Sequence, residues 1–105
     1  MGWRNKQHPV PLSVDLAATG ELLAAPGAGL RYTVQRYTLV AAGSVTVKFE
    51  SATTDLTGAM SLIAGVALVS TTALVCNENE ALNLTLGGSV QVSGHLEYAI
   101  QANDV

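Results

Sequence analysis

The chain of 105 residues is long enough for one domain, and 49% of its residues are hydrophobic while only 12% are charged. The charged share is about half of the usual value, so we expect either a compact surface of Ser, Thr, Asn and Gln or a surface largely covered by other subunits. The net charge of −3, with five scattered basic residues, argues against a nucleic-acid partner, which requires clustered Lys and Arg.

Residues 1–11 are predicted to form an extended N-terminal arm, and residues 12–105 a single β-sandwich domain. The arm contains the chain's one Trp and two of its three prolines, which disfavour a helix. A Trp on a free tail would expose a large apolar surface, so we expect Trp3 to dock on a neighbouring chain or to cover its own core. Arg4 and Lys6 are the other candidate interface residues of the arm. No apolar stretch follows these basic residues, so we expect no secretory signal and folding in a reducing cytoplasm.

The first half of the domain predicts strands at residues 12–16, 21–24, 30–41 and 44–50, where apolar and polar residues alternate. The apolar positions of the third strand change from even to odd numbers near Gln35 and Arg36. A shift of one residue turns every later side chain to the other face, so a β-bulge is predicted there. The Gly-containing loop at residues 25–29 is interpreted as a connection, because it lacks the Lys and the following helix of a phosphate-binding loop.

The second half of the domain contains a long, mostly apolar run at residues 59–76. A membrane-spanning helix requires about 20 predominantly apolar residues, whereas this run contains Gly65, Ser70 and many β-branched residues. We therefore predict two short strands at 59–64 and 66–76, the second of them broken, and no membrane partner. Cys76 ends the run and is predicted to be a buried apolar residue rather than a reactive thiol.

The last third of the chain predicts an exposed turn at residues 77–80, a strand at 82–86, a two-residue turn at Gly87 and Gly88, and a strand at 89–101. Seven to eight strands without a helical period indicate an all-β fold, an antiparallel β-sandwich that is jelly-roll-like. An immunoglobulin-type sandwich is the alternative, but its Cys, Trp, Cys spacing is absent.

His95 and Glu97 are the residues that come nearest to a chemical site, because they lie two apart on one predicted strand and so share a face. A metal site or an acid–base pair would need a third group that the sequence does not supply. We therefore expect no catalytic residue, no metal, no cofactor and no enzymatic activity, and we interpret the pair as exposed or as part of an interface. A sugar-binding surface would need exposed aromatic rings, and four of the five aromatic residues are predicted to face inward.

Three segments, TGELLAA (19–25), YTLVAAGSVTVKF (37–49) and TDLTGAM (54–60), with two shorter ones at 82–84 and 92–96, resemble small structural proteins of tailed bacteriophages. The resemblance spans roughly residues 18–100. It implies a capsid decoration or cement protein that stabilises the head shell at the capsid surface of the virion. The implied partners are the major capsid protein and further copies of the chain in a homotrimer. The alternative that it implies is a tail, baseplate or fibre module that binds a host-surface glycan or receptor.

Overall fold

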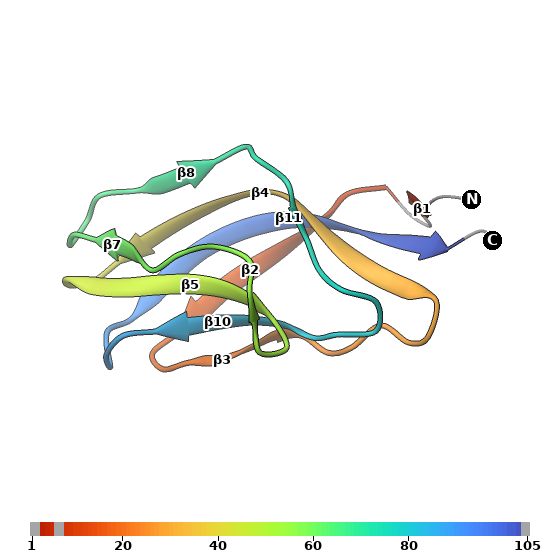
Figure 1. Cartoon of the computed structure of the whole chain (residues 1–105). Coiled ribbons are helices and arrows are strands. Elements are labelled where there is room, and N and C mark those ends of the chain that lie inside the picture. The colour runs from red at the N-terminus through yellow and green to blue at the C-terminus, as the bar shows by residue number, and fades with distance from the viewer. Residues whose placement is uncertain (1–2, 6–7, 104–105) are drawn as a thin grey trace.

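The computed structural model describes residues 3–5 and 8–103, which form two antiparallel sheets packed face to face (Figure 1). The larger sheet has six strands: β1 (Trp3–Asn5), β2 (Val10–Leu16), β4 (Leu30–Ala41), β8 (Leu68–Ser70), β9 (Leu74–Val75) and β11 (Val92–Asn103). The smaller sheet has five strands: β3 (Gly20–Leu23), β5 (Val45–Ser51), β6 (Thr54–Asp55), β7 (Met60–Leu62) and β10 (Leu82–Leu86). No helix that could cross a membrane occurs within these described ranges.

The connectivity of the two sheets is that of a jelly roll. In the larger sheet β11 lies between β4 and the pair β1 and β2, and in the smaller sheet β10 lies between β3 and β5. Three of the eight jelly-roll positions are each divided into two short strands (β1 with β2, β6 with β7, β8 with β9), so eleven strands fill eight positions. The first position then pairs with the last, the second with the seventh, and so on inward. The all-β antiparallel sandwich of jelly-roll type is confirmed.

The predicted β-bulge is present in β4. Glu97 of β11 lies opposite Arg36, whereas the next residue, Tyr98, lies opposite Val34, so Gln35 is the extra residue. The bulge also explains why the strand predicted at 66–76 is broken. On the other side of β4, β8 ends with Ser70 opposite Tyr37, and β9 begins with Leu74 opposite Val34. The three residues between β8 and β9 pass the bulge without pairing with β4, and they separate the two strands.

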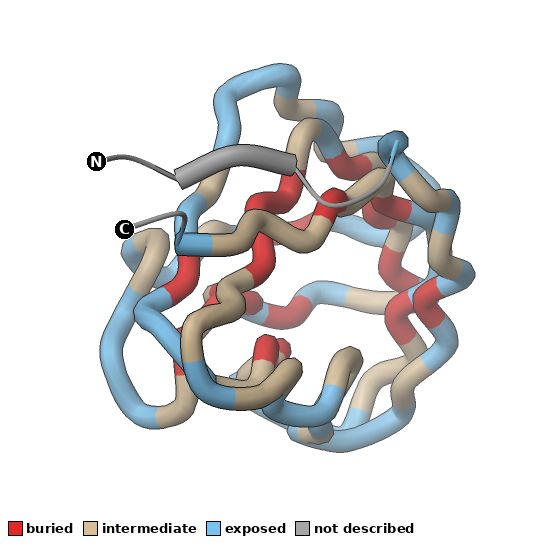
Figure 2. The backbone as a smooth tube through the Cα atoms, turned by 90° about the vertical axis from the view of Figure 1, so that its right-hand side faces the viewer, coloured by how far each residue is buried: buried red, intermediate tan, exposed pale blue. Residues whose placement is uncertain are grey.

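The core lies between the two sheets, where their inner faces meet. Phe49 from the smaller sheet is fully buried and packs against Tyr37 from the larger sheet, with ring centroids 4.7 Å apart. Both sheets follow the predicted alternation, as in β5, where buried and less buried residues alternate along the whole strand. Figure 2 shows the buried stretches on the inner sides of both layers and the exposed stretches in the connections.

The N-terminal boundary of the sheet differs from the expectation. The first domain strand was predicted from Leu12, but β2 begins at Val10 and includes Pro11, which lies opposite Glu97 of β11. Because β2 pairs with β11 alone, it is an edge strand, and an edge strand tolerates a residue without a backbone donor. Within the predicted arm, Trp3–Asn5 pairs with the end of β11 as β1.

Candidate functional site: an open side of the sandwich

One long side of the sandwich collects the exposed apolar side chains. It consists of β7, β8, β9 and the residues between them, residues 60–75, and is called the open side below. All four large apolar side chains that are exposed among the described residues belong to it: Ile63 (64% exposed), Val66, Val69 (63% exposed) and Val75. Single exposed apolar residues are normal, but the concentration of all four in one segment is typical of a surface that meets another molecule.

A tight turn presents two of these side chains. The Val66 N–H donates a hydrogen bond to the Ile63 carbonyl oxygen at 3.1 Å, and Gly65 between them has a φ of +74°. A turn of this kind needs a positive φ at its third residue, which glycine adopts without strain. The Gly65 N–H also donates to the Ala41 carbonyl oxygen at 3.0 Å, which attaches the turn to the end of β4. Ile63 and Val66 are therefore held at the surface by backbone hydrogen bonds.

The register of β8 and β9 determines where the other two exposed apolar side chains, those of Val69 and Val75, lie. Val69 lies opposite Thr38 and Val75 opposite Thr33, so both point away from the core. Their neighbours Leu68 and Leu74 are partly buried and pack against the core. The alternation in these two short strands thus turns one apolar residue inward and the next one outward, and Val69 and Val75 lie on the outer face of the larger sheet.

The outer edge of β8 and β9 is open. Within the described part of the chain, both strands pair with β4 alone, and nearly all of the residues between β7 and β9 are exposed. Proteins usually protect such an edge with a charge, especially Lys, or with Pro. Residues 56–77 contain neither a charged residue nor Pro. The open side therefore offers unpaired backbone groups and apolar side chains with no charge or proline to oppose strand addition, although its strands are only three and two residues long.

A shallow groove of about 390 Å³ adjoins the Ile63 turn. It is lined by neutral side chains of β5, the β7 end and the turn after β10, namely Ser44, Val45, Thr46, Ser61, Leu62, Ile63 and Gly87. Gly87 approaches Thr46 closely in this lining, and a Cβ atom on Gly87 would collide with the Thr46 hydroxyl. The uncharged surface thus continues from the edge of the larger sheet onto the smaller one.

The sequence contained a signal for this surface, but its meaning depends on topology. The pattern of the apolar run at 59–76 predicts ordinary strands and not a membrane span. Its lack of charge becomes significant only once β7, β8 and β9 are seen to lie at the edges of their sheets (Figure 1).

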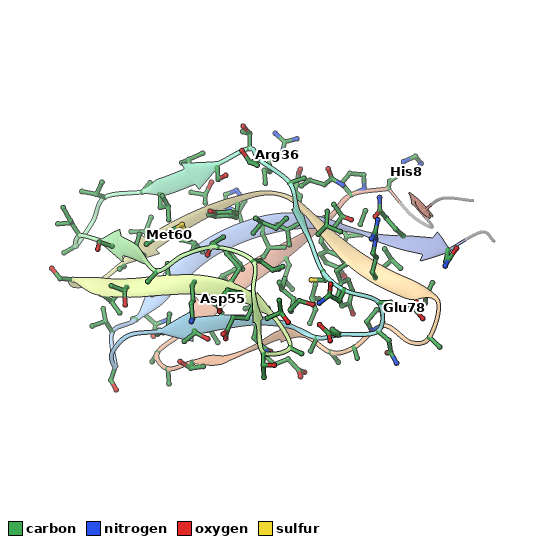
Figure 3. All side chains as sticks on the ribbon, viewed as in Figure 1. His8, Arg36, Asp55, Met60 and Glu78 are labelled. Carbon is green, nitrogen blue, oxygen red and sulfur yellow. The ribbon has the colours of Figure 1, made fainter. Side chains whose placement is uncertain are left out.

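The residues predicted from the sequence as interface candidates lie outside residues 60–75, although His95 and Val69 both lie opposite Thr38 on the outer face of the larger sheet. His95 is exposed on the outer face of the larger sheet, between Ser13 and Thr38 in the neighbouring strands. Glu97 shares that face, as predicted, and its carboxylate accepts a hydrogen bond from Arg36 Nε at 2.7 Å. Figure 3 labels Arg36 near the β8 edge of this sheet. Nowhere in the described ranges do three His, Cys, Asp or Glu side chains gather as they would to hold a metal ion.

The arm lies at the edge of the larger sheet that is opposite the open side. The backbone of Trp3 and Arg4 pairs with Asn103 and Ala102 of β11. Lys6 and the side chains of Trp3 and Arg4 lie outside the described residues. The docking of Trp3 on a neighbouring chain stays a prediction.

Cys76 is buried, as predicted, and its thiol is held in its protonated form. Burial raises the pKa of this thiol to about 11, and the nearby Glu80 carboxylate acts in the same direction, whereas a hydrogen bond with Ser51 opposes the rise. A thiolate is the nucleophilic form of cysteine, so a thiol with this pKa is inert at neutral pH. Cys76 is therefore part of the core.

Two hydrogen-bonded loops close one end of the sandwich. The buried Ser51 hydroxyl donates to Glu80 Oε1 at 2.7 Å and accepts from the Asn77 N–H at 2.9 Å. Next to it, the Glu78 carboxylate accepts a hydrogen bond from the Gly29 N–H at 2.8 Å (labelled in Figure 3). The Gly29 N–H of the Gly-containing loop thus already has a partner within the same protein, the Glu78 carboxylate. This agrees with the interpretation of the loop as a connection.

A partly exposed charged group marks the border of the uncharged segment. Lys48 Nζ lies 3.1 Å from Asp55 Oδ1 and 3.7 Å from Glu50 Oε2. The hydrogen bond and charge of Asp55 raise the pKa of Lys48, and the hydrogen bond from Lys48 lowers the pKa of Asp55. Exposed ion pairs of this type contribute little to stability. They place charge on the outer face of the smaller sheet. The next charged residue along the chain is Glu78.

Comparison with known proteins yields a likeness in fold alone. No protein-family model and no curated protein sequence matches the chain. The fold is similar to a solved structure from the Bacillus endospore appendages, which are described as a family of disulfide-linked pili. The likeness has a TM-score of 0.51 at 15% sequence identity, and it covers 95% of this chain and 93% of the other.

Proposed function

We propose that this chain is a non-enzymatic structural subunit that binds other protein chains through its open side. The observation that carries the proposal is that every exposed large apolar side chain of the described residues lies along one uncharged side of the sandwich, either on β8 and β9 or in the turn before β8. An exposed, apolar edge strand is an aggregation hazard for a free monomer. Coverage by another chain in an assembly removes that hazard and buries the apolar side chains.

In its more specific form, the proposal is a capsid decoration protein of a tailed bacteriophage. The chain would bind the major capsid protein at the surface of the head as a homo-oligomer, a trimer by analogy with the resembling proteins. The support is the sequence resemblance, together with a small jelly-roll sandwich that has one side suited to contact. A fold by itself hosts many functions, so the open side and not the jelly roll is the stronger support.

The second candidate is a subunit of an extracellular fibre, which the likeness to the endospore appendage pili favours. Those pili are described as disulfide-linked. The single cysteine of this chain is buried, so the folded chain offers no thiol of its own for such a link. A fibre of this chain would therefore be held by non-covalent contacts.

The glycan-binding tail module has less support. Tyr32, Tyr37 and Phe49 are buried, and Tyr98 packs against the core with its ring 5.6 Å from that of Tyr32. A sugar platform requires an exposed aromatic ring, and none of these four rings supplies one.

Fractionation of the native source distinguishes the two leading candidates. Density-gradient fractions that contain virions, tail-free heads or free fibres are analysed for the chain by quantitative mass spectrometry. A head decoration protein follows the major capsid protein at a constant ratio, including in tail-free heads. A fibre subunit follows fibres that lack capsid protein. A chain found only as free monomer would overturn the proposal of a structural subunit.

A further inference from the structure

The four open or partly open edges of the sandwich differ in how well they are protected. The edge at β2 contains Pro11 and Asp15, and the edge at β3 contains Glu21. The edge shared by β6 and β7 contains Asp55, and the buried Leu62 of β7 points toward the core. The edge formed by β8 and β9 alone combines uncharged strands with outward apolar side chains, those of Val69 and Val75.

We infer that β8 of one copy pairs antiparallel with β8 of a second copy, about a twofold axis at Val69. This inference rests on the proposed structural role and names the partner of the open side. In an antiparallel ladder, alternate residues of an edge strand turn their N–H and C=O groups away from their present neighbour, which in β8 is β4. These free groups are complementary to those of an identical strand that runs in the opposite direction.

Charge favours a second copy as the occupant. Each copy carries a net charge of −3, so most orientations bring like charges together. A twofold contact centred on Val69 joins two segments that contain no charged residue between Leu56 and Asn77, so no like-charged side chains face each other within it. A contact of this symmetry is self-complementary, because each residue that touches a partner residue is touched in return.

Exposed apolar residues also flank Val69 on both sides in the sequence. Ile63 and Val75, both exposed, lie at equal distances in sequence before and after Val69. In an antiparallel pair about Val69, the Ile63 end of one copy lies toward the Val75 end of the other. The pairing joins the six-stranded sheets of two copies into one continuous sheet and covers the β8 edge of each.

The β8 pairing joins two copies, so it cannot itself form the proposed homotrimer. It would be a second contact, in addition to the one that forms the trimer. A specific interface of standard size buries about 800 Å² on each partner, which is more than a short strand and four side chains provide. The isolated pair is therefore weak and concentration-dependent. It gains strength where a larger assembly already holds the copies side by side, because tethering raises their effective concentration.

A cysteine cross-link tests the pairing and its register. Directly opposite residues of an antiparallel pair have Cα atoms about 4.5–5.5 Å apart, within the range of about 4.4–6.8 Å that a disulfide spans. Val69→Cys is oxidised at high protein concentration with oxidised glutathione, which accepts the two electrons and two protons that the thiols release. Ala17→Cys, an exposed position on the opposite side of the larger sheet, is the matched control. Cys76 is buried and present in both variants.

The expected result is a disulfide-linked dimer of Val69→Cys that forms at least about tenfold faster than that of Ala17→Cys, since pairing raises the effective thiol concentration. Equal rates for the two variants, or a dimer from Ile63→Cys without one from Val69→Cys, would overturn the pairing. Circular dichroism of each variant checks that it is folded. If the chain co-sediments with its particle while Val69→Cys gives no excess of dimer, the structural role survives and only the self-pairing fails.

Discussion

Gly94 of β11 lies directly against the backbone of Thr38 in β4. A Cβ atom on Gly94 would collide with the Thr38 carbonyl oxygen, and it would stand 2.9 Å from the Thr38 carbonyl carbon and 3.1 Å from Leu39 Cα. Gly94 also has a φ of +148°, which side chains rarely allow. The two longest strands of the molecule can therefore approach each other here only because this residue is glycine.

Gly94→Ala is expected to destabilise the fold by about 2–5 kcal/mol, from backbone strain and overpacking against a rigid carbonyl group. The free energy of unfolding in urea measures the effect. Gly88→Ala is the control, since Gly88 has open space around it and no positive φ, and its effect should stay within about 1 kcal/mol. Equal unfolding midpoints for the two variants would contradict the close approach at Gly94.

Ser51→Ala tests the hydrogen bonds that hold the loop before β10. The substitution leaves the Asn77 N–H and the Glu80 carboxylate without the hydroxyl that now bonds both. The expected cost is about 1–3 kcal/mol, because two hydrogen bonds are lost and one of them is to a charged carboxylate. Urea unfolding measures it, with the exposed Ser89→Ala as control. A loss no greater than that of the control would show that the bonds do not stabilise the loop.

Cys76 should resist thiol reagents in the folded chain and react fully in urea. With a pKa of about 11 and a buried sulfur, it exposes almost no thiolate at pH 8. Labelling with a colourimetric disulfide reagent should be at least about 100-fold slower in the native protein than in urea. The exposed thiol of Ala17→Cys is the positive control. Rapid native labelling of Cys76 would contradict its place in the core.

The same thiol predicts a pH dependence of stability. Its pKa is raised in the fold above the ordinary value of 9.0, so the folded state disfavours the thiolate. The stabilisation is complete below the unfolded pKa and is lost as pH rises toward 11. The free energy of unfolding should therefore fall more steeply between pH 9 and pH 11 in the natural chain than in Cys76→Ala. Parallel pH profiles for the two proteins would contradict this assignment.

Val69→Lys tests the open side as a binding surface. A lysine there places a charge within the uncharged contact, and burying an unpaired charge is costly. We expect binding of the purified chain to particles stripped of it to weaken at least about tenfold, or about 1.4 kcal/mol. Stability should be unchanged, because Val69 is 63% exposed. Ala17→Lys, with the same change in net charge, should bind as the natural chain does. Equal binding by both variants would contradict the assignment of the open side.

Local pattern was sufficient to predict most strands and the bulge. β4 and β10 have the predicted bounds, and the change of apolar phase at Gln35 marks the bulge correctly. These features depend on the period of two in single segments. The division of the run at 66–76 into β8 and β9 was predicted only as a break, because its position depends on the bulge in a different strand.

The open side could not be predicted, because a sheet edge is a property of long-range pairing. Residues 56–77 are visibly uncharged in the sequence. Whether such a run is a central strand or an edge depends on whether another strand pairs beyond it, and here β8 has no partner but β4 among the described residues. The predicted interface pair of His95 and Glu97 rested on their shared face alone. That face is confirmed, but the exposed apolar residues lie at its edge.

An electron cryomicroscopy map of the intact assembly, at a resolution that shows strands, tests the central claim most directly. The open side, residues 60–75, is predicted to contact another protein chain in every copy, with Val69 covered. A map in which β8 and the Ile63 turn face solvent in all copies would contradict the account.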